Sequence, residues 1–375
     1  MPSPQLAVIG GGQLARMMQQ AAIGLGIHIR LLAEAPDVSA AQVVPDHVVG
    51  DYTNLDTLRS VVAEAPVVTF DHEHVPPEHL RALQAEGHAC RPGPHALLFA
   101  QDKAAMRQRL GALGVPCPRN AAISTRADLD QFGYPAVVKT TRGGYDGKGV
   151  WVVHTAADAD EAFASGRVLL AEELVDFRRE LSALVVRSPS GEMASYPVVE
   201  SRQANGVCAE VVAPAPGLDP TLDAAARGIA ERLAAELDVT GILAVELFET
   251  ADGRLLVNEL AMRPHNTGHW TIDGARTSQF ENHLRAVLDL PLGPTGARAP
   301  WSVMVNILGG SVADLEAQRA SVLAVEPDIK IHLYGKPVKA GRKVGHVTAY
   351  GDDLDIVTAR ARRAAAMFTD GAPQS

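Results

Sequence analysis

Cysteine is scarce in this chain. Its 375 residues include three cysteines, Cys90, Cys117 and Cys208, which lie far apart and form no C-x-x-C spacing. An odd number of widely spaced cysteines argues against a disulfide framework and against a cysteine-ligated zinc site. The scarcity fits a reducing compartment, so we expect a cytoplasmic protein.

Long apolar runs are also missing. No run approaches the roughly 18–20 residues that a membrane-spanning helix needs. The N-terminus lacks the basic segment followed by an apolar segment that is typical of a secretory signal. We therefore expect no membrane partner and no signal peptide.

Positive charge is in deficit. Lys and Arg number 34 against 44 Asp and Glu, which leaves a formal net charge of −10. An acidic chain binds a phosphate backbone poorly, so we expect no nucleic-acid partner. Basic residues that cluster locally can still bind small anions.

The patterns that are present indicate several folded units. From residue 5 to 100, short apolar runs alternate with helical patterns, which is typical of a parallel α/β sheet. A pair of prolines then leads into a predicted helix that ends near Gly114, and a Pro- and Gly-rich stretch covers 288–300. The region between mixes strands and helices, and 301–352 is mainly β in pattern before a closing helix. We predict three domains, at residues 1–100, 101–295 and 296–375.

The N-terminus carries a dinucleotide-binding fingerprint. Residues 10–15, GGGQLA, fit G-x-G-x-x-G/A after an apolar run, and Glu34 stands near the position of an acidic ribose contact. The pattern favours a Rossmann-like unit, and one hypothesis is an NAD-dependent dehydrogenase. That hypothesis leaves three downstream signals unexplained.

A lysine followed by a glycine-rich loop is the first signal. Lys139 ends the apolar run PAVVK, and RGGYDGKG occupies 142–149 before a second apolar run. Glycines let the main chain approach a ligand closely, and backbone N–H groups in such loops form anion-binding nests. A lysine within an apolar strand needs a counter-charge, which a bound phosphate would supply. The alternative is a flexible hairpin loop with a lysine that reaches solvent.

Two carboxylates form the second signal. Asp252-Gly253 is a favoured two-residue hairpin turn and would place Glu246 directly opposite Glu259. Like charges in this position destabilise a ladder, and a divalent cation between them would remove the repulsion. Mg²⁺ is usually held by one or two carboxylates together with substrate phosphates. The alternative is two solvated glutamates on an exposed face.

The third signal follows directly in the chain. The segment RPHNTGHW concentrates Arg263, His265, Asn266, His269 and Trp270 beside the carboxylate pair. The histidine spacing fits no standard zinc pattern well. The alternative is a loop with a buried tryptophan and a hydrogen-bonded histidine.

In this order, the motifs resemble those of an ATP-grasp ligase. Three segments narrow the resemblance to the N5-carboxyaminoimidazole ribonucleotide synthetase family: GGGQLARM, RPHNTGHWT and YGKPVKAGRKVGH. The resemblance extends from residue 6 to about residue 350. The resemblance implies an α/β and α+β fold with a Rossmann-like pre-ATP-grasp domain, a central ATP-grasp domain and a small β-rich C-terminal domain. It also implies ATP-dependent carboxylation of 5-aminoimidazole ribonucleotide with bicarbonate in purine biosynthesis, through carboxyphosphate. Mg²⁺ and a homodimer are expected on the same grounds.

The resemblance assigns residues to ATP and to the metal ion. The phosphates would contact the lysines and the glycine loop, the adenine would contact Glu172 and Val175, and the ribose would contact Glu180. The expected ATP-binding residues are Lys103, Lys139, Gly144, Tyr145, Asp146, Gly147, Lys148, Gly149, Val150, Glu172, Val175, Glu180, Gln203, Asn258 and Glu259. The expected Mg²⁺ ligands are Glu246 and Glu259.

The resemblance also assigns residues to the other two substrates. The expected catalytic residues are Arg263, His265, Asp146, Lys336 and Arg342. The expected contacts of the ribonucleotide are Gly12, Gln13, Leu14, Glu73, Tyr145, Lys336 and Arg342. The N-terminal glycine turn would then hold the 5′-phosphate of the ribonucleotide, and Glu34 would be a carboxylate at a strand end without a special role.

Two positions depart from the family pattern. Lys103 stands where the family often has arginine, and Gln203 stands where it often has histidine. A lysine still binds phosphate as a point charge, whereas a glutamine cannot titrate. Two further alternatives are a non-catalytic nucleotide-binding regulator and another ATP-grasp ligase, such as a formate-using glycinamide ribonucleotide transformylase. RPHNTGHW and GRKVGH favour the carboxylating family.

Overall fold

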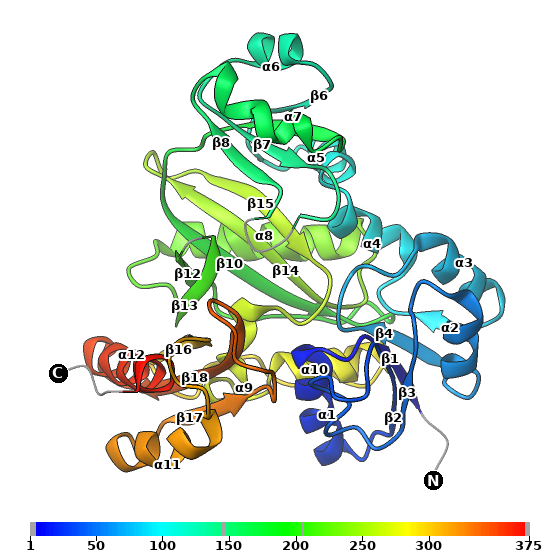
Figure 1. Ribbon diagram of the computed structural model, residues 1–375, viewed down its shortest axis with the longest axis vertical. Helices are drawn as coiled ribbons and strands as arrows, with labels where there is room; N and C mark the ends of the chain where they lie inside the picture. The colour runs from blue at the N-terminus through cyan, green and yellow to red at the C-terminus, as the bar shows by residue number, and fades with distance from the viewer. Residues whose placement is uncertain (1–4, 145–147, 205, 372–375) are drawn as a thin grey trace.

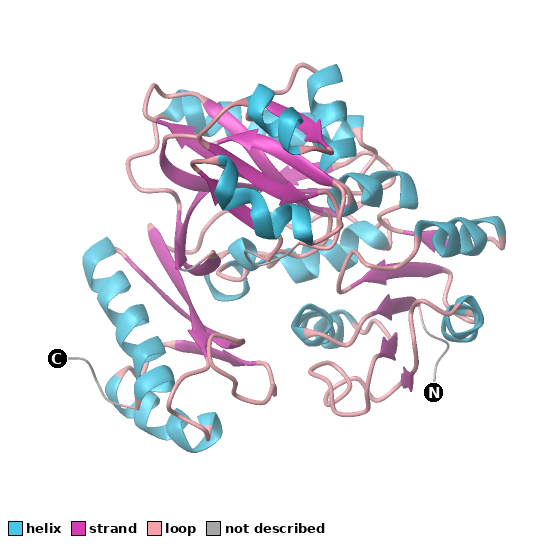
Figure 2. Cartoon of the chain, turned by 45° about the horizontal axis from the view of Figure 1, so that its top comes forward, coloured by secondary structure: helices cyan, strands magenta, loops and turns pink. Residues whose placement is uncertain are grey.

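Three β-sheets organise the chain, of which the computed structural model describes residues 5–144, 148–204 and 206–371. In Figure 1 the N-terminal elements lie at lower right in blue, the smallest of these sheets lies in the lobe at the top, and the last helices lie at lower left in orange and red. Figure 2 shows that helices flank the strands in each part.

The N-terminal unit is a parallel sheet flanked by helices. Its elements are β1 (Leu6–Ile9), α1 (Gln13–Leu25), β2 (Ile29–Ala33), β3 (His47–Val49), α2 (Leu55–Val62), β4 (Val67–Phe70), α3 (Pro77–Ala85), β5 (Ala89–Cys90) and α4 (Pro94–Gln101). The strand order is β3-β2-β1-β4-β5. Chain order reverses between β1 and β4, so their carboxyl ends form a topological switch point, where open α/β sheets bind ligands.

The predicted helix that ends near Gly114 is two helices. α4 ends at Gln101, and α5 (Lys103–Ala112) begins one residue later. Asp102 has an extended backbone, and its carboxylate accepts the N–H groups of Ala104 and Ala105. A strong N-cap inside an otherwise helical pattern therefore breaks the helix.

A small antiparallel sheet follows. Its elements are β6 (Asn120–Ile123), α6 (Arg126–Phe132), β7 (Ala136–Thr140), β8 (Val150–Val153), the 3₁₀ turn η1 (Ala156–Ala159), α7 (Asp160–Ala164) and β9 (Leu169–Glu173). The strand order is β6-β9-β7-β8. β7 and β8 are the apolar runs on either side of the glycine-rich loop, so Lys139 lies on a central strand.

The largest sheet has nine strands and carries the rest of the described chain. Its elements are β10 (Phe177–Arg187), β11 (Met193–Ser195), β12 (Val199–Ala204), β13 (Val207–Ala213), α8 (Pro220–Glu236), β14 (Gly241–Thr250), β15 (Leu255–Ala261), η2 (Asn266–Gly268), α9 (Thr271–Gly274), α10 (Gln279–Val287), β16 (Trp301–Leu308), α11 (Leu315–Val325), β17 (Lys330–Leu333), β18 (Lys343–Gly351) and α12 (Leu354–Asp370). The order is β15-β14-β10-β12-β13-β16-β18-β17, with β11 beside β10. Because β16 pairs with β13, the C-terminal strands extend the central sheet, and the boundary at residue 295 stays a prediction.

The helix α11 interrupts the segment 301–352, for which the sequence pattern predicts mainly strands. Of the helices in the described part of the chain, none combines the length and the apolar character that a membrane span requires.

The turn between β14 and β15 differs from the predicted one. Thr250 donates its N–H to the Arg254 carbonyl at 2.9 Å, so the loop has three residues, 251–253, and the two-residue turn is wrong. Gly253 has φ of 79°, the left-handed conformation that commonly ends a three-residue loop. The dipeptide Asp-Gly marks the turn correctly but does not determine its length.

A β-bulge restores the predicted register. The longer turn pairs Leu247 with Val257, yet Glu246 pairs with Glu259, because Asn258 is an extra residue in β15. The predicted pairing of the two glutamates is therefore confirmed, although for a different reason. The longer turn and the bulge compensate for each other.

α10 links the central sheet to the N-terminal unit. Its apolar face packs with α1, and its His283 is fully buried. His283 Nε2 lies 2.9 Å from the Thr69 hydroxyl, and Nδ1 accepts the Ile242 N–H at 3.2 Å. Burial lowers the pKa of His283 to about 3. The ring is therefore neutral in the folded protein throughout the physiological pH range.

This histidine predicts a loss of stability in acid. Between pH 6.5 and 3 the unfolded chain binds a proton that folded His283 excludes, so the free energy of unfolding falls by up to about 1.4 kcal/mol per pH unit as pH drops. We expect His283→Gln to remove that share of the slope, measured by urea unfolding between pH 4 and 7. His95→Gln, at a 55% exposed side chain, is the control. Equal slopes for wild type and His283→Gln would contradict the assignment.

Candidate active site

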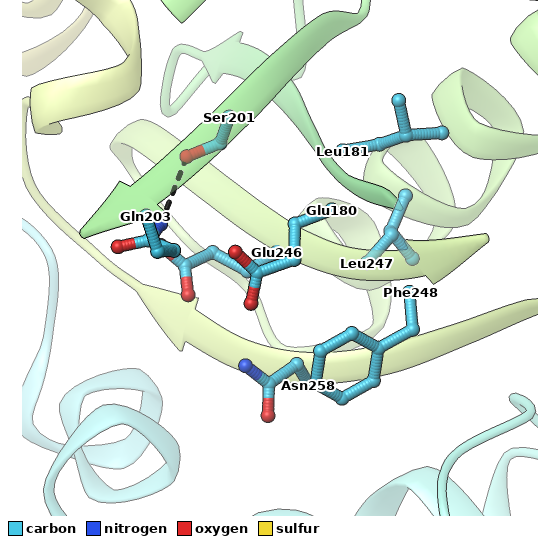
Figure 3. Close-up of a pocket in the computed structure, with 8 residues that line it drawn as sticks. All are labelled: Glu180, Leu181, Ser201, Gln203, Glu246, Leu247, Phe248 and Asn258. Carbon is cyan, nitrogen blue, oxygen red and sulfur yellow. Dashed lines mark hydrogen bonds between the residues drawn. The ribbon is translucent and has the colours of Figure 1, made fainter. Parts of the chain in front are cut away.

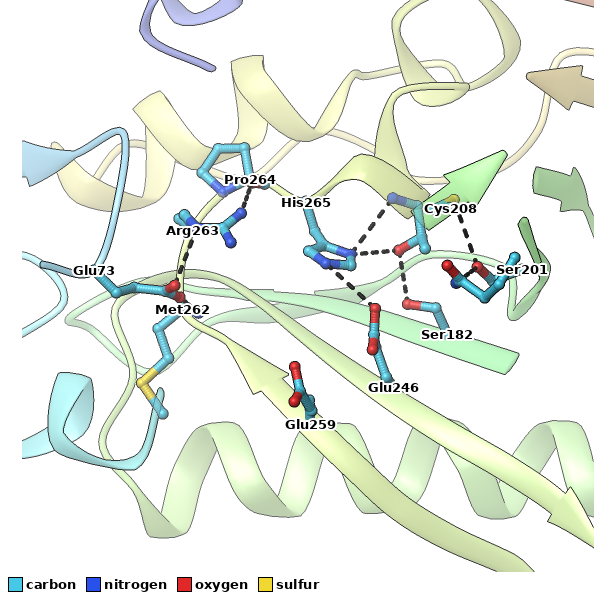
Figure 4. A network of polar contacts seen from close by, with 12 residues as sticks. Glu73, Ser182, Ser201, Cys208, Glu246, Glu259, Met262, Arg263, Pro264 and His265 are labelled. Carbon is cyan, nitrogen blue, oxygen red and sulfur yellow. Dashed lines mark hydrogen bonds and ion pairs between the residues drawn. The ribbon is translucent and has the colours of Figure 1, made fainter. Parts of the chain in front are cut away.

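Carboxylates gather on one face of the largest sheet, where β10, β14 and β15 lie side by side. Glu246 of β14 pairs with Glu259 of β15 and with Ser182 of β10. Glu180 lies two residues before Ser182 and points to the same face. Residues directly opposite each other in antiparallel strands share a face, so three carboxylates meet here. Figure 4 shows Glu246 beside Glu259, with His265 directed at Glu246.

Two lysines face this group. Lys103, the first residue of α5, forms an ion pair with Glu259 at 2.9 Å. Lys139 of β7 is buried, and its ammonium lies 2.8 Å from Glu172 and 3.2 Å from the Asn258 side-chain oxygen. The counter-charge that a buried lysine needs is therefore present in the protein itself, as Glu172.

The bulge in β15 lets neighbouring residues serve one site. In an unbroken strand, consecutive side chains point to opposite faces. Because Asn258 is the extra residue, its side chain reaches Lys139 while that of Glu259 reaches Lys103. The irregularity thus brings an amide and a carboxylate to the two lysines together.

Glu246 and Glu259 differ in their electrostatics. Burial, together with the charges of Glu259 and Glu180, raises the pKa of Glu246 to about 8. Burial acts in the same direction on Glu259, but Lys103 and Lys139 outweigh it and hold the pKa of Glu259 below its usual value. Positive charge therefore compensates Glu259 more strongly than it compensates Glu246.

The donor set fits a divalent cation that is held jointly with phosphates. Mg²⁺ takes one or two carboxylates plus substrate phosphates more often than an all-protein cage. Within residues 5–144, 148–204 and 206–371, no three His, Cys, Asp or Glu side chains form such a cage. Burial and the repulsion from Glu259 raise the pKa of Glu246, and a cation between the two carboxylates would offset that repulsion. The residues present fit Mg²⁺ that arrives with a nucleotide.

His265 is held as a neutral ring. Its Nδ1 lies 2.8 Å from the Thr267 hydroxyl and accepts the Thr267 N–H at 3.4 Å. Burial and the charges of Arg263 and Lys343 lower the pKa of His265 to about 3. With Nδ1 as acceptor, the proton is on Nε2, which lies 3.5 Å from Glu246. His265 is thus placed to donate a hydrogen bond at the carboxylate pair.

Arg263 is oriented by the N-terminal unit. Glu73, just after β4, accepts the Arg263 Nε–H at 3.1 Å and the Met262 N–H at 2.7 Å. The guanidinium also donates to the Pro264 carbonyl at 3.2 Å. Glu73 therefore bridges two units and sets the direction of the guanidinium (Figure 4). Its expected contact with the ribonucleotide stays a prediction.

A recess lies beside the carboxylates (Figure 3). Gln203 donates to the Ser201 hydroxyl at 2.9 Å, and burial raises the pKa of Glu180. The expected ribose contact, Glu180, thus lies in one recess with Gln203, the position that departs from the family pattern. The lining residues are Glu180, Leu181, Ser201, Gln203, Glu246, Leu247, Phe248 and Asn258.

The glycine turn after β1 is filled by the protein's own carboxylates. Asp71 accepts the N–H groups of Gly12 at 3.0 Å and of Ala15 at 2.7 Å, and burial raises the pKa of Asp71. Glu34 accepts the Gly11 N–H at 2.9 Å. A dinucleotide pyrophosphate would need these same amides. Glu34 therefore holds the turn and is not directed at a ribose.

Lys336 reaches the same turn from the C-terminal part of the chain. Its ammonium donates to the side-chain oxygen of Gln13. Gln42, from the N-terminal unit, donates to the Gly335 carbonyl at 2.8 Å and anchors this segment. Two residues that the sequence assigns to the ribonucleotide, Gln13 and Lys336, are thus brought together at the topological switch point.

The other predicted residues have less defined surroundings. Gly144, Lys148 and Gly149 belong to the glycine-rich loop and Val150 begins β8, whereas Tyr145, Asp146 and Gly147 lie outside the described residues. Val175 is half-buried between β9 and β10. Arg342 is exposed in the turn before β18.

Sequence reasoning missed three charged residues that shape the site. Buried Arg107 bonds to Glu172 at 2.6 Å, and its position four residues after Lys103 on α5 was the available signal. Asp71 caps α1 from a distant strand end, for which the sequence offers no local signal. Lys343 adds positive charge that lowers the pKa values of the neighbouring carboxylate and imidazole.

Comparisons with known proteins cover almost the whole chain. Family models match a ribonucleotide synthetase pre-ATP-grasp domain at residues 4–101, an ATP-grasp domain at 108–280 and a phosphoribosylaminoimidazole carboxylase C-terminal domain at 302–360. The N5-carboxyaminoimidazole ribonucleotide synthase of Mycobacterium tuberculosis is 53% identical over 380 residues, which cover 98% of this chain and 89% of that protein.

Solved structures are similar over the same length. The N5-carboxyaminoimidazole ribonucleotide synthetase of Thermus thermophilus has a TM-score of 0.88 at 39% identity, covering 99% of this chain and 100% of that one. The Aspergillus clavatus enzyme, solved with ADP and 5-aminoimidazole ribonucleotide, has a TM-score of 0.89 at 32% identity, covering 98% and 99%.

The matched domains, with paired carboxylates beside two lysines, define an ATP-grasp ligase, and they confirm the predicted three-domain fold class. The chain belongs to the N5-carboxyaminoimidazole ribonucleotide synthase family. This family carboxylates 5-aminoimidazole ribonucleotide with ATP and bicarbonate in purine biosynthesis, as the sequence predicts. The dehydrogenase hypothesis is therefore wrong.

Proposed function

We propose that this chain carboxylates 5-aminoimidazole ribonucleotide at the face formed by β10, β14 and β15. The observation that carries the proposal is the pairing of Glu246 with Glu259, with Lys103 at Glu259 and His265 at Glu246. Phosphoryl transfer asks mainly for positioning and for neutralisation of charge, and this arrangement offers both.

ATP binds between the small sheet and the large one. Lys103 and Lys139 meet its phosphates as point charges. The Glu172 carboxylate is taken by Arg107 and Lys139, so an adenine contact of this residue would not use that carboxylate. Mg²⁺, when bound by Glu246 and Glu259, would neutralise the phosphates further.

Bicarbonate binds at Arg263 and His265. Arg263, held by Glu73, presents its guanidinium to an oxyanion, and His265 donates from Nε2. A bicarbonate oxygen attacks the γ-phosphorus, the bond to the bridging oxygen of ADP breaks, and carboxyphosphate forms. Carboxyphosphate then divides into phosphate and CO₂ within the closed site, where water is excluded.

The ribonucleotide approaches from the N-terminal unit. Its 5′-phosphate binds beside Gln13 and Lys336, where the ammonium supplies the positive charge, and not on the α1 amides that Asp71 occupies. Its exocyclic amine attacks the carbon of CO₂, forms the new C–N bond and loses one proton. Asp146 or the departing phosphate takes that proton.

An ADP-release assay over a matrix of acceptors tests the proposal. ADP should form at full rate only with both 5-aminoimidazole ribonucleotide and bicarbonate. Another acceptor that stimulates ADP release where this ribonucleotide does not would overturn the substrate assignment. The homodimer and the cytoplasmic location stay predictions, and light scattering after size-exclusion chromatography measures the first.

Replacing Gly12 by alanine tests the phosphate end of the site. A Cβ there would lie 2.1 Å from an Asp71 oxygen, so the carboxylate must leave the start of α1. We expect Gly12→Ala to destabilise the protein by about 1–3 kcal/mol and to raise KM for the ribonucleotide but not for ATP. Gly24→Ala, whose Cβ would meet nothing within 4 Å, is the control. An unchanged KM for the ribonucleotide would count against this location.

A further inference from the structure

Arg107 is a buried arginine with a partner for each nitrogen of its guanidinium. Its side chain is 1% exposed, and Nε donates to Glu172 at 2.6 Å. The two terminal nitrogens donate to the carbonyls of Val257 and Asn258, at 2.9 and 2.8 Å. Burying a guanidinium costs free energy unless its donors are used. The guanidinium is therefore held by two kinds of contact, one with the Glu172 carboxylate and one with the carbonyls of β15.

The contact between Arg107 and the carbonyls of β15 supports the bulge. β15 lies at the end of the described sheet, so its outer carbonyls face α5 and not another strand. Arg107 supplies the donors that a neighbouring strand would otherwise supply. It does so at Val257 and Asn258, where the bulge brings Asn258 and Glu259 to the lysines.

The other contact sets the charge at Lys139. Glu172 lies 2.6 Å from Arg107 and 2.8 Å from Lys139, so one carboxylate is shared between two cations. The three groups together carry one net positive charge. Without Arg107, Glu172 and Lys139 would form a neutral pair, and no net positive charge would remain there for a ligand.

We propose that Arg107 is a positioning residue that neutralises Glu172, so that the charge of Lys139 stays available to the phosphates of ATP. This inference rests on the proposed function, in which Lys139 binds a phosphate. It assigns to Arg107 a role in ATP affinity that involves no contact with ATP.

Kinetic constants for ATP in single and double variants test the inference. Arg107→Gln leaves Glu172 paired with Lys139 alone, so KM for ATP should rise about tenfold or more, with a smaller change in kcat. Arg107→Gln combined with Glu172→Gln removes both charges and should return KM to within about threefold of wild type. A purely structural role predicts a double variant at least as impaired as the single one. Arg109→Gln, on the same helix at a 38% exposed side chain, should match wild type.

Two more variants keep the test decisive. Arg107→Lys retains the positive charge but lacks the planar guanidinium and its several donors. It should therefore have a lower Tm than wild type, with a KM for ATP within about threefold of wild type. If Arg107→Gln does not fold, a KM for ATP raised about tenfold in both Arg107→Lys and the double variant overturns the inference. Lys139→Met separates the two hypotheses. An unchanged KM for ATP in that variant removes the proposed role of Lys139, whereas a raised KM without rescue in the double variant overturns the role of Arg107 alone.

Discussion

Replacement of Glu259 by glutamine is expected to lower kcat/KM for ATP, measured as ADP formation, by about 10²–10³-fold while the fold is retained. The amide keeps the shape of the side chain but removes its charge, so Mg²⁺ loses a carboxylate ligand and Lys103 loses its partner at 2.9 Å. ADP release at saturating ribonucleotide and bicarbonate measures the loss, and circular dichroism measures the fold.

The same hairpin offers a matched control for this variant. Asp252 lies in the turn with a 61% exposed side chain, away from the carboxylate pair. Asp252→Asn removes one negative charge from the hairpin and should leave turnover close to wild type. Normal turnover in Glu259→Gln would refute the assignment of this residue to the metal ion.

Replacement of Arg263 by lysine is expected to lower kcat/KM for bicarbonate by about a hundredfold, with KM for ATP changed less than about twofold. Lysine keeps the positive charge, but it lacks the planar fork that bonds to Glu73 at 3.1 Å and presents further donors to a planar oxyanion. Initial rates with bicarbonate varied at fixed ATP, and the reverse, separate the two constants.

Glu73→Gln provides a graded comparison. This variant keeps Arg263 but weakens the ion pair that orients the guanidinium. The decrease in kcat/KM for bicarbonate should therefore be smaller than in Arg263→Lys. An unchanged KM and kcat for bicarbonate in Arg263→Lys would contradict the proposed binding of bicarbonate at this arginine.

Local sequence patterns predict much of this site, because strand alternation and turn residues act over short distances. The facing of Glu246 and Glu259 is the clearest example. The prediction succeeds even though the turn has three residues, because Asn258 forms a bulge that restores the register. No residue type marks a bulge in advance, so the part that Asn258 plays was visible only in the structure.

Contacts between distant segments account for what the sequence does not predict. Asp71 fills the glycine turn that resembles a dinucleotide fingerprint, and Glu172 supplies the counter-charge that Lys139 needs. Arg107 reaches the Glu172 carboxylate from α5. Each contact joins elements whose relative placement depends on packing of the whole domain, which local patterns do not encode.

Transfer of oxygen from bicarbonate to phosphate tests most directly whether bicarbonate is phosphorylated during the reaction. The enzyme is supplied with ATP, 5-aminoimidazole ribonucleotide and bicarbonate labelled with ¹⁸O, and the released phosphate is analysed by mass spectrometry. Attack of a bicarbonate oxygen on the γ-phosphorus predicts one ¹⁸O atom in each phosphate formed. Phosphate without ¹⁸O, released at the rate of carboxylation, would contradict the carboxyphosphate route.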